Sequence, residues 1–147
     1  MAIYYAAQQV GVADGSLIPA AKADGGQVGA NLITTLATKV AGQAWAAGDQ
    51  IYLGRLRPGE HLRRIWGNTD TSFGSATISI GTLAAPTKYA NARTLTATNT
   101  PTALGPLASA AGAGPLSAGE DLYLTLGAAG VAAGVNFTLE LEIACVK

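Results

Sequence analysis

The residues best suited to catalysis in this sequence are one histidine and one cysteine. His61 is the sole histidine, so a Ser–His–Asp or Cys–His arrangement could form only once, with Cys145 or a serine as nucleophile. His61 follows a Pro-Gly turn, where a solvated strand residue is expected. Cys145 falls on the apolar side of an alternating segment, which favours a small buried hydrophobe over a reactive thiolate. We therefore assign no catalytic residue and expect the chain not to be an enzyme.

Metal and phosphate sites have little support. Zinc sites use several cysteines and histidines, and this chain has one of each. The carboxylates that calcium would need lie far apart or mark strand ends, at Asp49, Asp70, Glu120 and Asp121. Asn136-Phe137-Thr138 matches a glycosylation sequon on a predicted strand, and we treat the match as chance. No glycine-rich phosphate motif is present, so we expect neither a metal nor a cofactor.

Four arginines surround a predicted hairpin: Arg55, Arg57, Arg63 and Arg64. The planar arginine fork binds carboxylates with two hydrogen bonds, which suits a contact between proteins. Nucleic acid is the competing partner, but no aromatic residues alternate with the arginines to stack on bases. A solvated hairpin end is the simplest interpretation, and a protein–protein contact is the main alternative.

The histidine, the cysteine and the arginines would be positioned by β-strands, because the apolar residues around them alternate with a period of two. Val135 to Cys145 places Val, Phe, Leu, Leu, Ile and Cys on one side, with Glu140 and Glu142 on the other. Glu120 to Leu126 repeats the pattern. We expect these two segments to form an antiparallel pair joined by a glycine-rich loop.

The middle of the chain has the same organisation. Residues 49–56 and 61–66 read as strands joined by Arg57-Pro58-Gly59-Glu60, whose Pro and Gly suit a type II turn. In the second of these strands we expect Leu62 and Trp66 on one side and Ile65 on the other. Residues 75–83 form another alternating strand, and the threonines and β-branched residues of 27–40 favour a strand there too.

Two segments lack this periodicity. Residues 1–26 contain two Asp-Gly pairs and are predicted to form an extended N-terminal arm preceding a β-sandwich domain at 27–147. Residues 84–119 are predicted to be a long low-complexity excursion with one strand near residues 94–98.

The composition favours an assembly protein. Of 147 residues, 49% are hydrophobic and only 12% are charged, against about 25% in an ordinary domain. Such a surface is poorly protected against association. Nine basic residues balance nine acidic ones, which argues against nucleic acid or an anionic membrane as partner.

A family resemblance adds to this. The run from Ala46 to Leu62, with Gly48-Asp49-Gln50-Ile51 leading into Leu56-Arg57-Pro58-Gly59, resembles a pattern in small virion proteins of tailed bacteriophages. Residues 74–82 and 120–126 are similar to the following strands of the same family, and the resemblance extends from Gln27 to the C-terminus.

The resemblance implies a jelly-roll-like β-sandwich and a head decoration (cement) protein on the capsid exterior. Its partners would be the major capsid protein and copies of itself, often in a homotrimer. Ile3, Tyr4 and Tyr5 in the arm are candidates for strand addition to a neighbour's sheet, beside the four arginines as interface residues. The alternatives are another virion part, such as a fibre base, tail or neck component, and a carbohydrate-binding sandwich that stacks sugars on Trp45 or Trp66.

Overall fold

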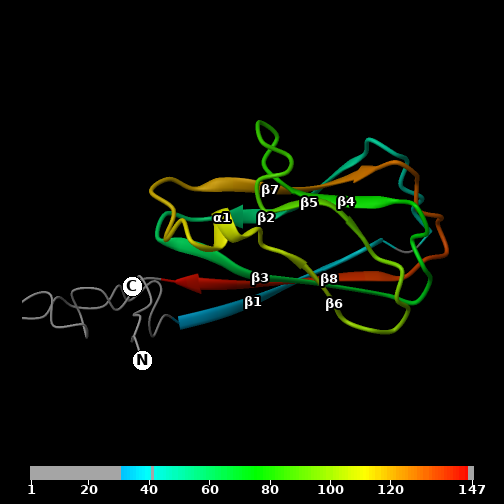
Figure 1. Ribbon diagram of the computed structural model, residues 1–147, viewed down its shortest axis with the longest axis horizontal. Helices are drawn as coiled ribbons and strands as arrows, with labels where there is room; N and C mark the ends of the chain where they lie inside the picture. The colour runs from blue at the N-terminus through cyan, green and yellow to red at the C-terminus, as the bar shows by residue number, and fades with distance from the viewer. Residues whose placement is uncertain (1–30, 41, 146–147) are drawn as a thin grey trace, which may run out of the picture.

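Alternating apolar residues form eight strands in the computed structural model, which describes residues 31–40 and 42–145. The strands are β1 (Asn31–Thr38), β2 (Gln50–Leu56), β3 (Glu60–Thr69), β4 (Thr77–Gly81), β5 (Ala90–Thr94), β6 (Thr102–Gly105), β7 (Glu120–Gly127) and β8 (Phe137–Cys145), and a short helix is α1 (Ala108–Ala111). They form two antiparallel four-stranded sheets stacked face to face (Figure 1). The prediction of an all-β sandwich is confirmed.

The chain crosses repeatedly between the two sheets. The first sheet has the strand order β1-β8-β3-β6 and the second has the order β2-β7-β4-β5. Among the described strands, only β4 and β5 follow each other in the same sheet. The predicted strand at 27–40 is confirmed as β1, and the strand at 75–83 as β4. The predicted arm at 1–26 lies outside the described residues.

The core lies between the inner faces of the sheets. In β7, and in β8 as far as Ile143, every second side chain is buried, as the period of two requires. The resulting layer of large, almost fully buried side chains comprises Leu122, Leu124, Leu126, Leu139, Leu141 and Ile143. The predicted sidedness is therefore confirmed for Leu122 to Leu126 and for Phe137 to Ile143, whereas at the end of β8 Ala144 is buried and Cys145 is only half-buried.

The predicted pairing of β7 with β8 is wrong. β7 pairs with β2 and β4, whereas β8 pairs with β1 and β3. The linker between them crosses the end of the sandwich, where Trp45 and Val131 exchange backbone hydrogen bonds of 2.9 and 2.8 Å. Two strands that each have one apolar face can bury those faces in two ways. They can lie side by side in one sheet, or they can face each other across the core from different sheets. The alternation alone does not distinguish these arrangements.

The segment 57–60 forms the predicted turn but not a hairpin. Gly59 has φ of +85°, and the N–H of Glu60 donates to the carbonyl of Arg57 at 3.1 Å, as in a type II turn. The strands on either side, however, belong to different sheets. The turn therefore carries the chain from one layer to the other.

A β-bulge reverses the predicted sidedness of β3. The register with β8 shifts between Leu62 and Arg64. This extra residue brings Leu62 and Ile65 to the buried side, and Trp66 is 36% exposed on the outer face. The prediction that Leu62 and Trp66 share a side was wrong because a bulge leaves no clear signal in the alternation.

Residues 84–119 contain more structure than predicted. β5 ends at Thr94, where a strand was expected to begin, and the residues after it leave the sheet. β6 and α1 then lie within the predicted low-complexity excursion. Leu95 and Leu104 are nearly fully buried, so the segment contributes to the core despite its bias toward Ala, Gly and Thr.

Candidate interaction surface

Arg55 lies on the outer face of the second sheet. It is directly opposite Asp121 in the register of β2 with β7. Its Nη1 donates to both carboxylate oxygens of Asp121, at 3.1 and 3.2 Å. Both side chains are well exposed, at 58% and 41%, so this pair stabilises the fold by less than about 1 kcal/mol. The charge of Arg55 is thus already matched within the chain.

Arg64 lies on the opposite outer face, that of the first sheet. Its cross-strand neighbour on β8 is Glu142, and the Nε to Oε1 distance is 3.7 Å. Because Arg55 and Arg64 project from different sheets, the arginines predicted as one cluster do not form one patch. The cause is the turn at 57–60, which separates β2 from β3.

Arg57 and Arg63 differ from the other two arginines. Arg57 is exposed in the turn, where its backbone N–H donates to Oε2 of Glu60 at 2.8 Å, and Arg63 is half-buried at the bulge of β3. Within residues 31–40 and 42–145, neither side chain has an ion pair. These two guanidinium groups are therefore the ones available to a partner's carboxylate. Ile3, Tyr4 and Tyr5 lie outside the described residues.

His61 and Cys145 lie near each other at one end of the first sheet. In the register of β3 with β8, His61 is opposite Ala144, and Glu60 is opposite Cys145. His61 is only 3% exposed, not a solvated strand residue as predicted. The Sγ of Cys145 lies 3.8 Å from Oε1 of Glu60.

A cluster of polar groups connects the loop before β5 to the start of β7. Lys88 Nζ lies 2.6 Å from Oε2 of Glu120, and the hydroxyl of Tyr89 donates to the other oxygen of the same carboxylate. Burial, with the hydrogen bond to Glu120 and its charge, raises the pKa of Tyr89 above its usual value of 10.0. Lys88 and Tyr89 also line a cavity of about 230 Å³ beside His61 and α1. The carboxylate of Glu120 is thus fully engaged in holding these segments together.

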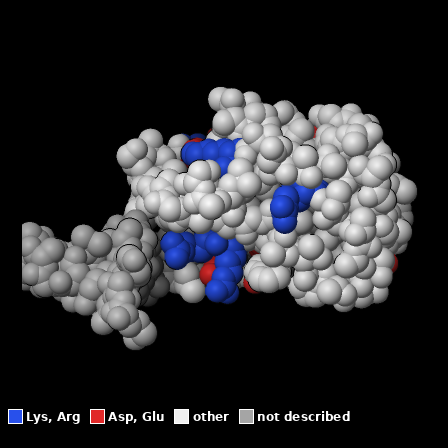
Figure 2. Space-filling view, in the orientation of Figure 1, with Lys and Arg blue, Asp and Glu red and all other residues white. Residues whose placement is uncertain are grey.

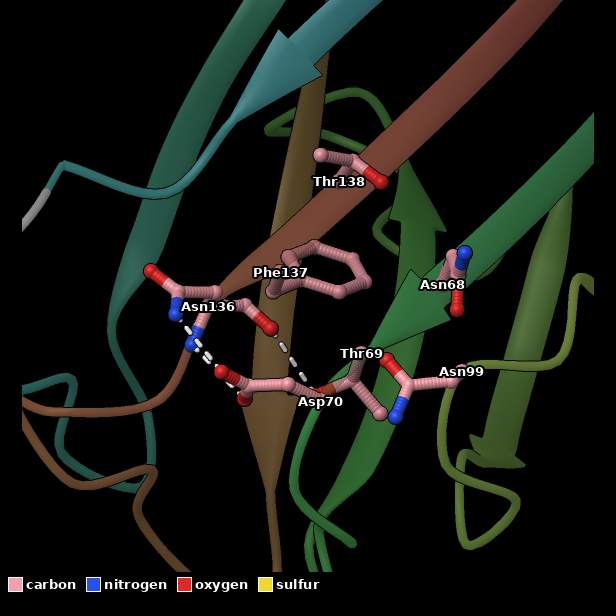
Figure 3. Close-up of a pocket in the computed structure, with 7 residues that line it drawn as sticks. All are labelled: Asn68, Thr69, Asp70, Asn99, Asn136, Phe137 and Thr138. Atoms are coloured by element: carbon pink, nitrogen blue, oxygen red, sulfur yellow. Dashed lines mark hydrogen bonds between the residues drawn. The ribbon is translucent and has the colours of Figure 1, made fainter.

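A polar pocket of about 180 Å³ lies at the opposite end of the sandwich, between the end of β3 and the start of β8. Figure 3 shows Asp70 and Asn136 facing each other, with the carboxamides of Asn68 and Asn99 apart from this pair. Asp70 accepts hydrogen bonds from the backbone N–H and from Nδ2 of Asn136, at 3.0 and 2.6 Å. These donors lower the pKa of Asp70 below its usual value of 3.8.

The carboxylate in this pocket, that of Asp70, is therefore already hydrogen-bonded within the chain. Nδ2 of Asn136, the side-chain nitrogen of the sequon, makes this contact. In the part of the chain that the structure describes, no group of three or more His, Cys, Asp or Glu residues could hold a metal ion. No sequence pattern predicts the Asp70–Asn136 pair, because the partners are 66 residues apart.

Exposed apolar side chains are the remaining feature of the surface. Leu32 and Leu36 of β1 are 60% and 64% exposed, and Tyr52 on β2 is 56% exposed. Figure 2 shows wide areas without any charged side chain on the face that it presents. The sparse charge predicted to favour association is therefore accompanied by exposed apolar residues on both sheets. The uncharged stretch of β1 was visible in the sequence, but its position at a sheet edge was not.

Comparisons with known proteins identify the architecture. A chain of the cyanophage Pam1 capsid asymmetric unit superposes with a TM-score of 0.56 at 15% identity, covering 91% of this chain and 96% of the other. A chain of the capsid of Ralstonia phage GP4 superposes with a TM-score of 0.55 at 19% identity, covering 80% and 86%. This fold occurs in phage capsids.

The sequence itself is distant from known families. No family model matches it, and no curated protein matches it. At 15% and 19% identity these two structures share the fold with this chain over 91% and 80% of its length. Among the described residues, no helix is long and apolar enough to cross a membrane.

Proposed function

We propose that this protein is a non-enzymatic structural component of a bacteriophage virion, and specifically a decoration (cement) protein on the outer surface of the head. The observation that carries the proposal is the likeness to a chain of the Pam1 capsid asymmetric unit, which extends over 91% of this chain and 96% of that one. The match therefore extends over most of both chains, which are of similar length.

The strand order supports a jelly roll, the finer description of the fold. In the first sheet β1 pairs with β8, and in the second sheet β2 pairs with β7, so each sheet brings an early strand beside a late one. Eight strands in two sheets, with the chain passing back and forth between them, is the arrangement of jelly rolls, which occur in viral capsid proteins. The decoration role and the homotrimer come from the family resemblance of residues 46–62 and of the strands that follow them.

The physical role of such a protein would be to bridge neighbouring capsid subunits. Apolar surface buried in the contact stabilises it by about 25 cal/mol per Å², before the entropy of association is subtracted. The bridge then opposes separation of the subunits when packaged DNA presses outward. Exposed apolar side chains with few charges between them suit this role, because a charged group would have to be desolvated or paired on binding.

Binding to heads tests the proposal. Purified protein is mixed with phage heads that lack it, and the heads are sedimented. We expect saturable binding, added density on the outside of the particle by electron microscopy, and heads that survive heating better. A protein that does not sediment with heads, or density in the tail or neck only, would contradict the decoration role.

Removal of residues 1–10 tests the arm. We expect this deletion to weaken head binding and to leave the circular dichroism spectrum and thermal midpoint of the domain unchanged, because the buried core of the described residues spans 45–144. Unchanged occupancy on heads would show that Ile3, Tyr4 and Tyr5 are not needed for binding.

A carbohydrate-binding sandwich is the second candidate, and one observation favours it. Tyr52 and Tyr123 form an edge-to-face pair on the outer face of the second sheet, with ring centroids 5.4 Å apart. Trp45, however, is only 6% exposed in the core and offers no face to a sugar. Glycan binding by the purified protein that is lost in Tyr52→Ala or Trp66→Ala would support this candidate.

A further inference from the structure

Four strands form the outer edges of the two sheets, and three of them carry features that hinder pairing with another strand. β6 has only four residues, and prolines lie just before and just after it, at 101 and 106. β2 contains an irregularity between Tyr52 and Gly54 and the charged Arg55. β5 has five residues, a register shift and a residue with positive φ, Ala92. Short length, proline, charge and bulges are the common protections of exposed edges.

β1 has none of these protections. It has eight residues, Asn-Leu-Ile-Thr-Thr-Leu-Ala-Thr, without a charge or a proline. Its register with β8 runs from Asn31 to Thr38 without a shift. No strand within the described ranges pairs with its other edge. A regular, uncharged edge with exposed leucines is a template for a further strand.

We propose that β1 pairs antiparallel with β1 of a second copy of this chain, around a twofold axis that passes beside Thr34. The two first sheets then form one continuous eight-stranded sheet, with both sandwiches on the same side of it. A twofold contact requires one surface to complement itself, so that when residue i meets residue j, residue j also meets residue i.

The sequence of β1 satisfies this condition around Thr34. Even-numbered residues lie on the outer face, because Thr34 is opposite Glu142 and the large buried side chains of β8, from Phe137 to Ile143, are odd-numbered. With the axis beside Thr34, Leu32 of each copy meets Leu36 of the other, and the two Thr34 side chains meet at the axis. Apolar pairs and Thr–Thr pairs directly across two strands are favourable.

Neighbouring registers are less suitable. An axis beside Thr35 would place Leu36 against Thr34 and Leu32 against Thr38, so that each leucine would meet a polar residue. On the inner face, the register beside Thr34 brings Ile33, which is 47% exposed, against Thr35 of the second copy. The pairing therefore covers the exposed apolar side chains of β1 on both faces.

Electrostatic repulsion does not oppose the pairing. β1 is uncharged, and the nearest carboxylates in line with the axis are the two copies of Glu142 on β8. Three strand spacings separate them, about 14 Å, which exceeds the screening length of about 8 Å at physiological salt. Each Glu142 is also within 3.7 Å of Arg64 of its own chain.

This inference rests on the edge of β1 and not on the proposed role in the capsid. A twofold contact through β1 also differs from the threefold association that the family resemblance implies, which would have to use another surface. Protein that binds heads but sediments alone as a monomer would overturn the pairing and leave the capsid role standing.

Cross-linking of single cysteines tests the register. In a Cys145→Ala background, Thr34→Cys places two thiols opposite each other, at a Cβ separation of about 5 Å. In the matched variant Leu32→Cys, the two thiols are four residues apart along the strands, about 13 Å. With a short bis-maleimide we expect a covalent dimer from Thr34→Cys and little from Leu32→Cys. No dimer from Thr34→Cys, or equal amounts from both, would overturn the proposal.

The mass in solution provides the second test. We expect sedimentation equilibrium to give two chains per particle, or a multiple of two, and Thr34→Lys to raise the dimer dissociation constant by at least about tenfold because two like charges meet at the axis. Asn91→Lys, on the exposed edge strand β5, is the control and leaves the dimer intact. Wild-type protein with a mass of one or three chains, or dimers unaffected by Thr34→Lys, would refute the pairing.

Discussion

The ring of Trp45 meets the ring of Phe137 edge to face, with centroids 6.0 Å apart and planes at 81°. Trp45 precedes β2 in the second sheet, and Phe137 is the first residue of β8 in the first sheet. The ring of Phe73 packs against the same phenyl ring of Phe137, with the two centroids 5.2 Å apart. This aromatic group joins the two layers at the end of the sandwich where the linker between β7 and β8 crosses.

Phe137→Ala should therefore destabilise the protein strongly. Phe137 is 2% exposed, and truncation of a buried phenylalanine costs about 3–5 kcal/mol because a cavity remains. Urea denaturation followed by circular dichroism measures the change. Thr138→Ala, on the other face of β8, is the control and should cost less than about 1 kcal/mol. A midpoint that barely moves in Phe137→Ala would contradict the packing of this end.

Asp70 should make stability depend on acidic pH. Its pKa is lowered in the folded protein by the two N–H donors of Asn136, so its stabilising contribution is present above its usual pKa of 3.8 and is lost as pH falls through the folded value. We expect the wild type to lose more stability than Asp70→Asn between about pH 5 and pH 2. Urea midpoints across this range give the comparison. Parallel curves for the two proteins would show that the pair with Asn136 does not form in solution.

Tyr89 should affect stability at alkaline pH. Burial and Glu120 raise its pKa in the folded state, so its contribution is fully present below the unfolded value of about 10 and is lost as pH rises toward the folded value. We expect wild-type stability to fall above about pH 10 and Tyr89→Phe to fall less. A spectroscopic titration of the folded protein should show one tyrosine that ionises after the others. If Tyr89→Phe declines as steeply as the wild type, the hydroxyl is not held as described.

Arg57 should contribute to binding of phage heads more than to folding. It is exposed in the turn between β2 and β3, and it has no ion pair within the described residues. Arg57→Glu should leave the unfolding midpoint unchanged within about 0.5 kcal/mol and weaken head binding by about tenfold or more. Arg93→Glu, on the exposed edge strand β5, is the matched control. Equal effects of both variants on binding would indicate a general charge effect and no contact at Arg57.

The sequence predicted the strands better than their partners. The alternation in Glu120 to Leu126 and in Val135 to Cys145 identified two strands and their buried sides, because burial of one face determines which residues are apolar. It did not show that the strands face each other across the core. Pairing is determined by the path of the linker, and a glycine-rich linker is compatible with a hairpin and with a crossing between sheets.

The same limit applies to the arginines. Arg55 and Arg64 are close in the sequence and were expected around one hairpin, but the turn at 57–60 sends β2 and β3 into different sheets. Their carboxylate partners, Asp121 and Glu142, come from strands far along the chain. Such contacts between distant residues depend on register, and a single sequence does not reveal register.

The pairing of β1 with β8 places Asn31 opposite Cys145, at nearly the full distance along the described chain. During synthesis on a ribosome, β1 emerges first, and its partner emerges last. Loop closure over such a separation is slow, as in other β-proteins with distant contacts. β1, an uncharged segment rich in β-branched residues, therefore stays unpaired until β8 has left the exit tunnel. Nascent chains of this protein are predicted to depend on chaperones that cover this segment.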